Sequence, residues 1–102
     1  MRLYIEPEAE AELEETAQGY ETAAAGLGLE FLTDMRRSTE AILDAPLRYP
    51  RFSHAENVRC AHAVGRFPHL VVYMVGGDTV HVLAFMNPRR RPGYWLSRLP
   101  RR

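Results

Sequence analysis

Two amphipathic helical patterns joined by a short glycine loop constrain the fold of this chain more than any other feature of its sequence. In the first pattern, apolar residues recur with the period of an α-helix, at Ala9, Leu13, Ala17, Tyr20 and Ala24. Glu6-Pro7 starts this helix, because proline fits the first helical turn and acidic residues there complement the helix dipole. The glutamates outside the apolar stripe are predicted to form a solvated acidic face: Glu8, Glu12, Glu15 and Glu21.

A second helical pattern follows a tight reversal at Gly26 and Gly28 and ends before Pro46. Its stripe consists of Phe31, Leu32, Met35, Thr39, Ile42 and Leu43. Two antiparallel helices of this kind form a hairpin that can bury both stripes only against a third surface. We expect that surface to be a β-sheet.

Four segments have the pattern of β-strands, at residues 2–5, 58–67, 69–75 and 79–86. The last two meet at a hairpin turn, Gly76-Gly77-Asp78, and their nearly continuous apolar content predicts the central strands. Arg59 and Arg66 would face opposite sides of a regular strand, unless a bulge near Gly65 brings them to one face. The loop at 45–57 is predicted to be extended and packed by Tyr49 and Phe52.

The predicted fold class is therefore α+β, in the order strand, helix, helix, strand, strand, strand, with the helix hairpin on one face of a mostly antiparallel sheet. Residues 1–102 are predicted to form a single domain, since no repeat or second domain is visible. The polar, proline-punctuated tail at 87–102 is predicted to be poorly ordered. No apolar stretch approaches the roughly 20 residues that span a bilayer, and the first residues have no apolar targeting core. We expect a cytoplasmic protein without a membrane partner.

The net charge of zero conceals a separation of charge along the chain. Residues 1–44 carry eleven acids and three arginines, a net charge of −8, whereas residues 45–102 carry two acids and ten arginines, a net charge of +8. Arginine suits planar pairing with phosphate or carboxylate. The densest cationic region is Arg89-Arg90-Arg91, followed by Arg98, Arg101 and Arg102. This region predicts nucleic-acid binding or an acidic protein partner, which do not exclude each other, and the alternative is a solvated tail. We favour function for Arg90 and a solvated tail for the last few residues.

Neither the histidines nor the single cysteine predicts a metal site. The spacing of His54, His62, His69 and His81 does not gather ligands, and we expect each to be an ordinary surface or sheet-edge histidine. Cys60 allows no internal disulfide, and its strand context predicts a small buried apolar role. No cofactor is expected.

A series of residues occurs in the order and spacing of one known family: Pro7-Glu8-Ala9, Leu13, Tyr20, Gly28, Phe31-Leu32, Pro46, Pro50, Val58-Arg59, Phe67-Pro68, Tyr73, Arg90, Pro92, Tyr94 and Trp95. With the order of elements, they make residues 2–98 resemble the RelE/ParE superfamily of bacterial type II toxins, which includes plasmid-stabilisation toxins. The chain departs from the family pattern at Asn87 and Arg91, where many relatives have a histidine and an acid. The role of that histidine is therefore not transferred.

The resemblance implies a small growth inhibitor that a cognate antitoxin, encoded beside it, holds inactive in a hetero-oligomer. RelE-like toxins cut messenger RNA on the ribosome, whereas ParE-like toxins poison DNA gyrase by binding it. We favour the ParE-like function, because the chain has few groups for proton transfer and no lysine. A ribosome-dependent endoribonuclease and a degenerate toxin that only binds an antitoxin are the alternatives.

Metal-independent RNA cleavage would need a base, an acid and a cation that stabilises the phosphorane. The candidate catalytic residues are Arg59, Arg66 and Arg90 for charge stabilisation, with Tyr94 or a histidine for proton transfer. The candidate target-binding residues are Arg89, Arg90, Arg91, Trp95 and Arg98. Tyr94-Trp95 has a structural alternative, which we favour, as an aromatic latch that closes one edge of the core.

The toxin interpretation expects Arg59, Arg66 and Arg90 on one accessible side of the C-terminal half, with the acidic helix pair behind it. An antitoxin helix or strand could dock in the groove between the helices or at the sheet edge, and the sequence does not choose between these places.

Overall fold

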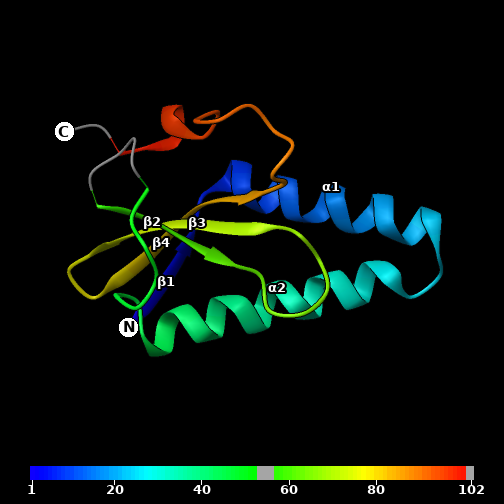
Figure 1. The fold of residues 1–102 in the computed structure, drawn as a ribbon, viewed down its shortest axis with the longest axis horizontal. Helices are drawn as coiled ribbons and strands as arrows, with labels where there is room; N and C mark the ends of the chain where they lie inside the picture. Colours follow the sequence, from blue (N-terminus) through cyan, green and yellow to red (C-terminus); the bar gives the residue numbers. More distant parts are fainter. Residues whose placement is uncertain (53–56, 101–102) are drawn as a thin grey trace.

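The structure, a computed structural model, describes residues 1–52 and 57–100. Its elements are β1 (Arg2–Ile5), α1 (Pro7–Ala23), α2 (Leu27–Asp44), β2 (Val58–His62), β3 (Leu70–Gly76), β4 (Thr79–Met86) and the short 3₁₀ helix η1 (Leu96–Arg98) (Figure 1). The sheet order is β1-β4-β3-β2, with β1 parallel to β4 and the other pairs antiparallel. The predicted α+β class, the order of the elements and the central position of β3 and β4 are confirmed.

The turn between α1 and α2 is stabilised by the Glu21 carboxylate, and the two helices approach closely at Gly28. Only three residues separate α1 from α2, and Gly26 supplies the left-handed conformation of the turn, with φ 85°. The Glu21 carboxylate accepts the backbone N–H groups of Gly26 and Gly28, at 2.9 and 3.0 Å, and so satisfies donors at the start of α2. Gly28 lies inside α2, where an added Cβ would lie 2.5 Å from the Ala17 carbonyl oxygen. The absence of a side chain at Gly28 therefore lets the two helices touch.

The strand predicted at 58–67 is shorter than expected, since β2 ends at His62. Gly65 lies in the following loop with φ +100°, and an added Cβ there would lie 2.2 Å from the Asp34 carboxylate. The loop therefore leaves the sheet to pack on α2, and the possible bulge near Gly65 is wrong.

A bulge occurs instead in β4. Val72 pairs with Ala84 and Tyr73 pairs with Val82, so Leu83 is an extra residue. Val82 and Phe85 consequently face the helices, whereas Leu83 and Ala84 both face the opposite side.

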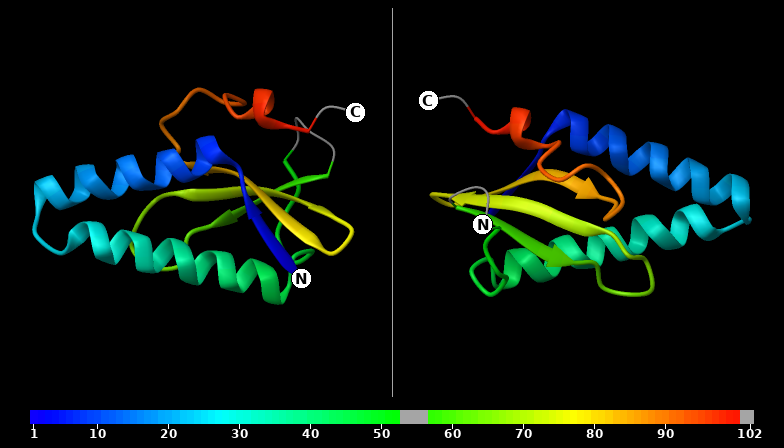
Figure 2. Two further views of the ribbon diagram at one scale, coloured as in Figure 1. Left: turned by 180° about the vertical axis from the view of Figure 1, so that it is seen from behind. Right: turned by 45° about the horizontal axis from the view of Figure 1, so that its top comes forward.

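The sheet has a core on each face. The core on the helix side includes Phe31, Met35, Ile42, Val71, Tyr73, Val82 and Phe85. The core on the other side consists of Val58, Val72, Leu83, Ala84, Met86 and Trp95. Figure 2 shows the C-terminal segment, residues 87–100, on the side of the sheet away from α2. The prediction of a poorly ordered tail is therefore wrong for residues 87–100, because this segment supplies Trp95 to the second core; Arg101 and Arg102 lie outside the described residues.

Within the part of the chain that the structure describes, no helix has the length and apolar character needed to span a bilayer.

Candidate functional site

Glu12 on α1 gathers three side chains of the C-terminal segment. Its Oε2 accepts a hydrogen bond from the Tyr94 hydroxyl at 2.5 Å, and its Oε1 accepts one from Arg98 Nη1 at 2.8 Å. Arg90 Nη1 lies 3.8 Å from Glu12 Oε2. The Glu12 side chain is only 14% exposed, so the expected solvated position of this glutamate is wrong. Its spacing of three residues from Ala9, at the border of the apolar stripe, is the sequence signal for this placement.

The Glu12 cluster (Glu12, Arg90, Tyr94 and Arg98) lies beside the part of β4 that has no paired strand on its β1 side. β1 pairs with β4 only as far as Val82. Beyond that point the Phe85 N–H donates to Glu12 Oε1 at 3.3 Å, and the Leu83 carbonyl accepts from Arg98 Nη1 at 3.0 Å. These side chains thus satisfy backbone groups at the bulge that no strand pairs.

Tyr94 lies beneath both arginines of the cluster. The Arg90 Cζ is 4.0 Å from the centroid of the Tyr94 ring, and the Arg98 Cζ is 5.1 Å from it. Burial, the hydrogen bond to Glu12 and the Glu12 charge together raise the pKa of Tyr94 well above its usual range. In this arrangement the hydroxyl is a hydrogen-bond donor to a carboxylate at neutral pH.

The three arginines proposed for RNA cleavage do not converge. Arg59 Nη1 donates to the carbonyls of Leu47 and Tyr49, at 3.2 and 2.6 Å, just beyond the C-terminal end of α2. Arg66 pairs with Glu30, in the first turn of the same helix, at 2.9 Å. At 1.5 Å per residue, these two ends of α2 are roughly 20 Å apart, while Arg90 is held over α1. The expectation of one shared accessible side for the three is wrong.

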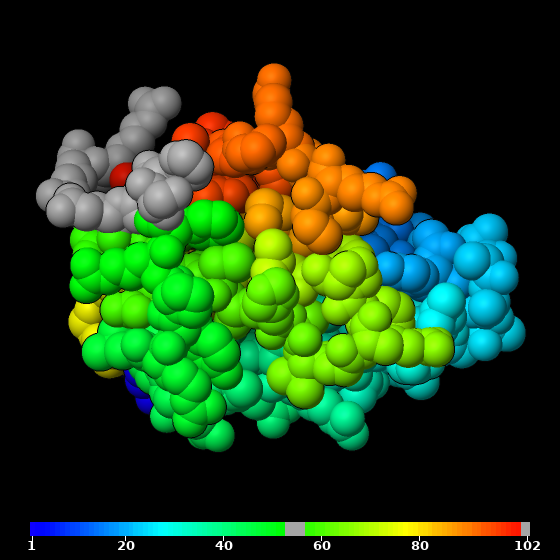
Figure 3. Space-filling view, in the orientation of Figure 1, coloured from blue at the N-terminus to red at the C-terminus, as the bar shows by residue number. Residues whose placement is uncertain are grey.

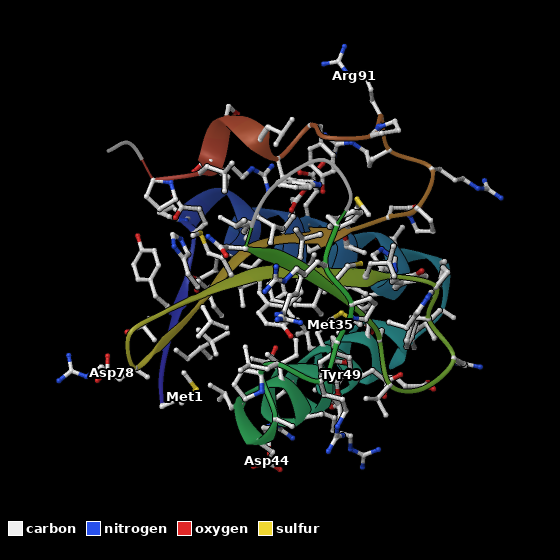
Figure 4. All side chains as sticks on the ribbon, turned by 60° about the vertical axis from the view of Figure 1, so that its left-hand side comes forward. Met1, Met35, Asp44, Tyr49, Asp78 and Arg91 are labelled. Atoms are coloured by element: carbon white, nitrogen blue, oxygen red, sulfur yellow. The ribbon has the colours of Figure 1, made fainter. Side chains whose placement is uncertain are left out.

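The candidate target-binding residues divide into an outer and an inner set. Arg89 and Arg91 are exposed, Arg90 is 53% exposed, and Figure 4 shows Arg91 pointing away from the body of the molecule. Trp95 is 1% exposed and packs against Phe52, with 5.4 Å between ring centroids. Arg98 is turned inward to Glu12. Among the five candidate target-binding residues, the outer set is therefore Arg89, Arg90 and Arg91, which present charge to solvent.

No known family model matches this sequence, and no curated protein matches it. Among solved structures the chain is similar to one in the "Chromosomal ParDE TA system from P. aeruginosa", with a TM-score of 0.70 and 21% sequence identity. The alignment covers 82% of this chain and 91% of that chain. The chain has the RelE/ParE-like fold. The fold expected from the resemblance is therefore confirmed.

The histidines of this RelE/ParE-like fold have different environments. His69 is fully buried, 4.9 Å from the Phe31 ring by centroids, and burial lowers its pKa below the usual value despite the Glu12 charge. The expectation of a surface or sheet-edge histidine is therefore wrong for His69, which lies over the helix-side core. His81 Nε2 lies 2.5 Å from Glu6 Oε2, and His62 is exposed on the edge strand β2. His54 lies outside the described residues.

Burial raises the pKa of the half-buried Cys60 thiol to about 11, so it carries no thiolate at neutral pH. Among residues 1–52 and 57–100, no group of three His, Cys, Asp or Glu side chains could hold a metal ion.

The RelE/ParE-like fold leaves an apolar groove between the helix hairpin and the edge strand β1. The groove has a volume of about 190 Å³ and contains Leu3, Ile5, Leu13, Leu32 and Leu43. Leu32 also lines a second hollow between the helices, of about 390 Å³, beside Leu29, which is 69% exposed. Exposed leucines that line two neighbouring hollows are typical of a protein-binding surface.

Proposed function

We propose that this chain is the toxin of a type II toxin–antitoxin system, a ParE-like growth inhibitor that a cognate antitoxin neutralises by direct binding. The observation that carries the proposal is the likeness in fold to a chain of the P. aeruginosa ParDE TA system, over most of both chains. The separated charge and the exposed leucines of the helix hairpin support a protein partner.

The apolar groove (Leu3, Ile5, Leu13, Leu32 and Leu43) is the antitoxin-docking surface that we favour. Its leucines come from both helices and from β1, so an amphipathic helix can bury its apolar face there while lying along the sheet edge. This choice combines the two docking places that the sequence leaves open.

Within this function, DNA gyrase is the target that we favour, bound by the toxin rather than chemically altered. Cleavage of RNA would require a cation, a base and an acid around one phosphate. Arg59 and Arg66 are engaged at opposite ends of α2, and the Tyr94 hydroxyl is engaged by Glu12. The geometry therefore supports a binding surface at Arg89–Arg91 better than a nuclease centre.

Three assays test this function together. Induced expression is expected to arrest growth, and co-expression of the small protein encoded by the adjacent gene is expected to relieve the arrest. The purified chain is expected to block supercoiling by gyrase and to leave ribosome-bound message intact. Codon-positioned cuts in message that disappear in Arg90→Ala would replace this function with the endoribonuclease. Tight binding of the neighbouring protein without growth arrest in any host would indicate the degenerate toxin.

A further inference from the structure

A small recess lies between the end of β4 and the C-terminal segment, beside the exposed arginines. Its lining combines the apolar side chains of Phe52, Met86 and Trp95, of which Met86 and Trp95 are buried, with the exposed Pro88, Arg90 and Pro92 and with Gly93. Its volume of about 220 Å³ is below the range of roughly 300–1,000 Å³ that is typical of small-molecule pockets. The recess, here named the proline recess, is therefore sized for one large apolar side chain.

Arg90 is the charged residue that lines the proline recess, and two more arginines are its neighbours in the chain. Arg89 and Arg91 flank Arg90 in the chain and are exposed. No ion pair between described residues involves Arg89 or Arg91, whereas Arg90 has its 3.8 Å approach to Glu12. Guanidinium groups pair with carboxylates in a bidentate manner. An apolar lining beside these arginines favours a ligand that combines one apolar side chain with several carboxylates.

The backbone of the recess is held in place before any ligand arrives. Gly93 turns the chain with φ +76°, and the Tyr94 N–H donates to the Arg91 carbonyl at 3.3 Å. The next side chain along, Tyr94, is anchored to Glu12 by its hydroxyl. The prolines further restrict the segment. A ligand that enters a preformed recess loses less free energy to the ordering of loops.

We propose that the proline recess binds an acidic segment of a protein partner, which inserts one apolar side chain between Pro88 and Pro92 and pairs its carboxylates with Arg89, Arg90 and Arg91. The inference rests on the proposed function in that the partner is the antitoxin. It deepens that function by assigning the antitoxin a second contact, separate from the groove between the helices and β1.

The observations favour an acidic peptide over a nucleic acid. Single-stranded nucleic acids stack their bases on exposed aromatic rings, whereas Trp95 is buried under the recess. The hollow on the other side of Arg90 contains Glu12 and Glu15, which would repel a continuous phosphate backbone. A peptide places its charges at separate positions and can avoid these glutamates.

Trp95 is the only tryptophan of the chain, so its fluorescence reports on the proline recess. The full chain is titrated with a capped seven-residue peptide that has a central leucine between three acidic residues on each side. A matched peptide has serine in place of the leucine. We expect a saturable change in fluorescence with the leucine peptide and at least tenfold weaker binding of the serine peptide, because only the leucine buries apolar surface. Equal binding of the two peptides, or no binding of the leucine peptide, overturns the proposal.

Two variants and one further probe complete the test. Arg91→Ala is expected to lower the affinity for the leucine peptide roughly threefold to tenfold, because one carboxylate of the peptide loses its partner. Arg2→Ala, which removes an exposed arginine from β1, is expected to leave the affinity unchanged. A twelve-nucleotide oligouridine is expected to bind more weakly than the leucine peptide, and tighter binding overturns the proposal in favour of a nucleic acid. Because peptide binding needs no toxicity, a failed growth assay with intact peptide binding would count against the toxin function and leave the acidic-ligand site standing.

Discussion

The Tyr94 hydroxyl donates to the Glu12 carboxylate at 2.5 Å, across 82 positions of the chain. This bond joins the first helix to the segment that covers the opposite face of the sheet. The same carboxylate neutralises the inward-turned Arg98. The Glu12 cluster is therefore expected to control both the stability of the chain and the shape of the surface that carries Arg89–Arg91.

Glu12→Ala is expected to lower the free energy of unfolding by roughly 3 kcal/mol, because it leaves the Arg98 guanidinium, whose side chain is only 11% exposed, without its carboxylate. Glu12→Gln keeps the shape and an acceptor, so it is expected to cost about half as much. Urea denaturation measures both variants. The exposed Glu15→Ala on the same helix is the control, with an expected change within about 0.5 kcal/mol. Equal effects of Glu12→Ala and Glu15→Ala would contradict the role of the cluster.

Gly28→Ala and Gly19→Ala are expected to have opposite effects on stability. An added Cβ at Gly28 would meet the Ala17 carbonyl oxygen at 2.5 Å, so the helices must separate, at a cost of about 1–3 kcal/mol. At Gly19 nothing lies within 4 Å of the added Cβ, and alanine is expected to stabilise α1 by about 0.5–1 kcal/mol. Thermal denaturation compares the two variants. A stabilising Gly28→Ala would show that the helices do not touch at this point.

Acid is expected to destabilise the chain through His69. Because burial lowers the His69 pKa from 6.5, the unfolded chain binds a proton that the folded chain does not, and the free energy of unfolding falls as the pH drops below about 6.5. His69→Leu is expected to remove this part of the pH dependence between pH 6.5 and 5.5. Urea denaturation at pH 5.5, 6.5 and 7.5 measures it. The exposed His62→Gln is the control and should retain the wild-type slope.

Tyr94→Phe and Arg66→Ala are expected to retain growth arrest. Tyr94→Phe loses one hydrogen bond to Glu12, about 1 kcal/mol, and keeps the ring beneath Arg90. Arg66→Ala loses a mostly exposed ion pair with Glu30, which contributes roughly 0–1 kcal/mol. Growth curves after induction, with expression levels matched, give the readout. Loss of toxicity in both variants, with folding intact, would favour a nuclease over a binding toxin.

The sequence predicted the parts of the fold that follow from local periodicity. The stripe beginning at Ala9 and the apolar runs of β3 and β4 fix which elements form and which strands are central. The end of β2 could not be predicted, because it depends on the fit between Gly65 and Asp34, residues that are far apart in the chain. The ordered tail was missed for a similar reason, since its stability comes from Trp95 packing on a sheet face that only exists in the folded protein.

The sequence predicted which types of residue form the candidate site, but it did not predict how their side chains are arranged. The clustered arginines at 89–91 are visible in the sequence and lie on the surface. The anchor of the site, Glu12, resembles its neighbours in an acidic helix, and its inward position depends on the bulge at Leu83 and on the missing strand pair beyond Val82. The helical period places Glu12 at the border of the apolar stripe, but it does not identify Phe85, Tyr94 and Arg98 of other elements as the partners of its carboxylate.

The extra residue in β4 also limits how the chain can change in length. One strand supplies Val82 and Phe85 to the helices and Leu83 and Ala84 to the C-terminal segment. Deletion of Leu83 would leave Val82 and Phe85 on the helix side, but it would remove one of the two consecutive side chains that face the C-terminal segment and the carbonyl that Arg98 binds. Insertions and deletions in homologous sequences are therefore expected to be rare at residues 82–85, even where the surrounding loops differ in length.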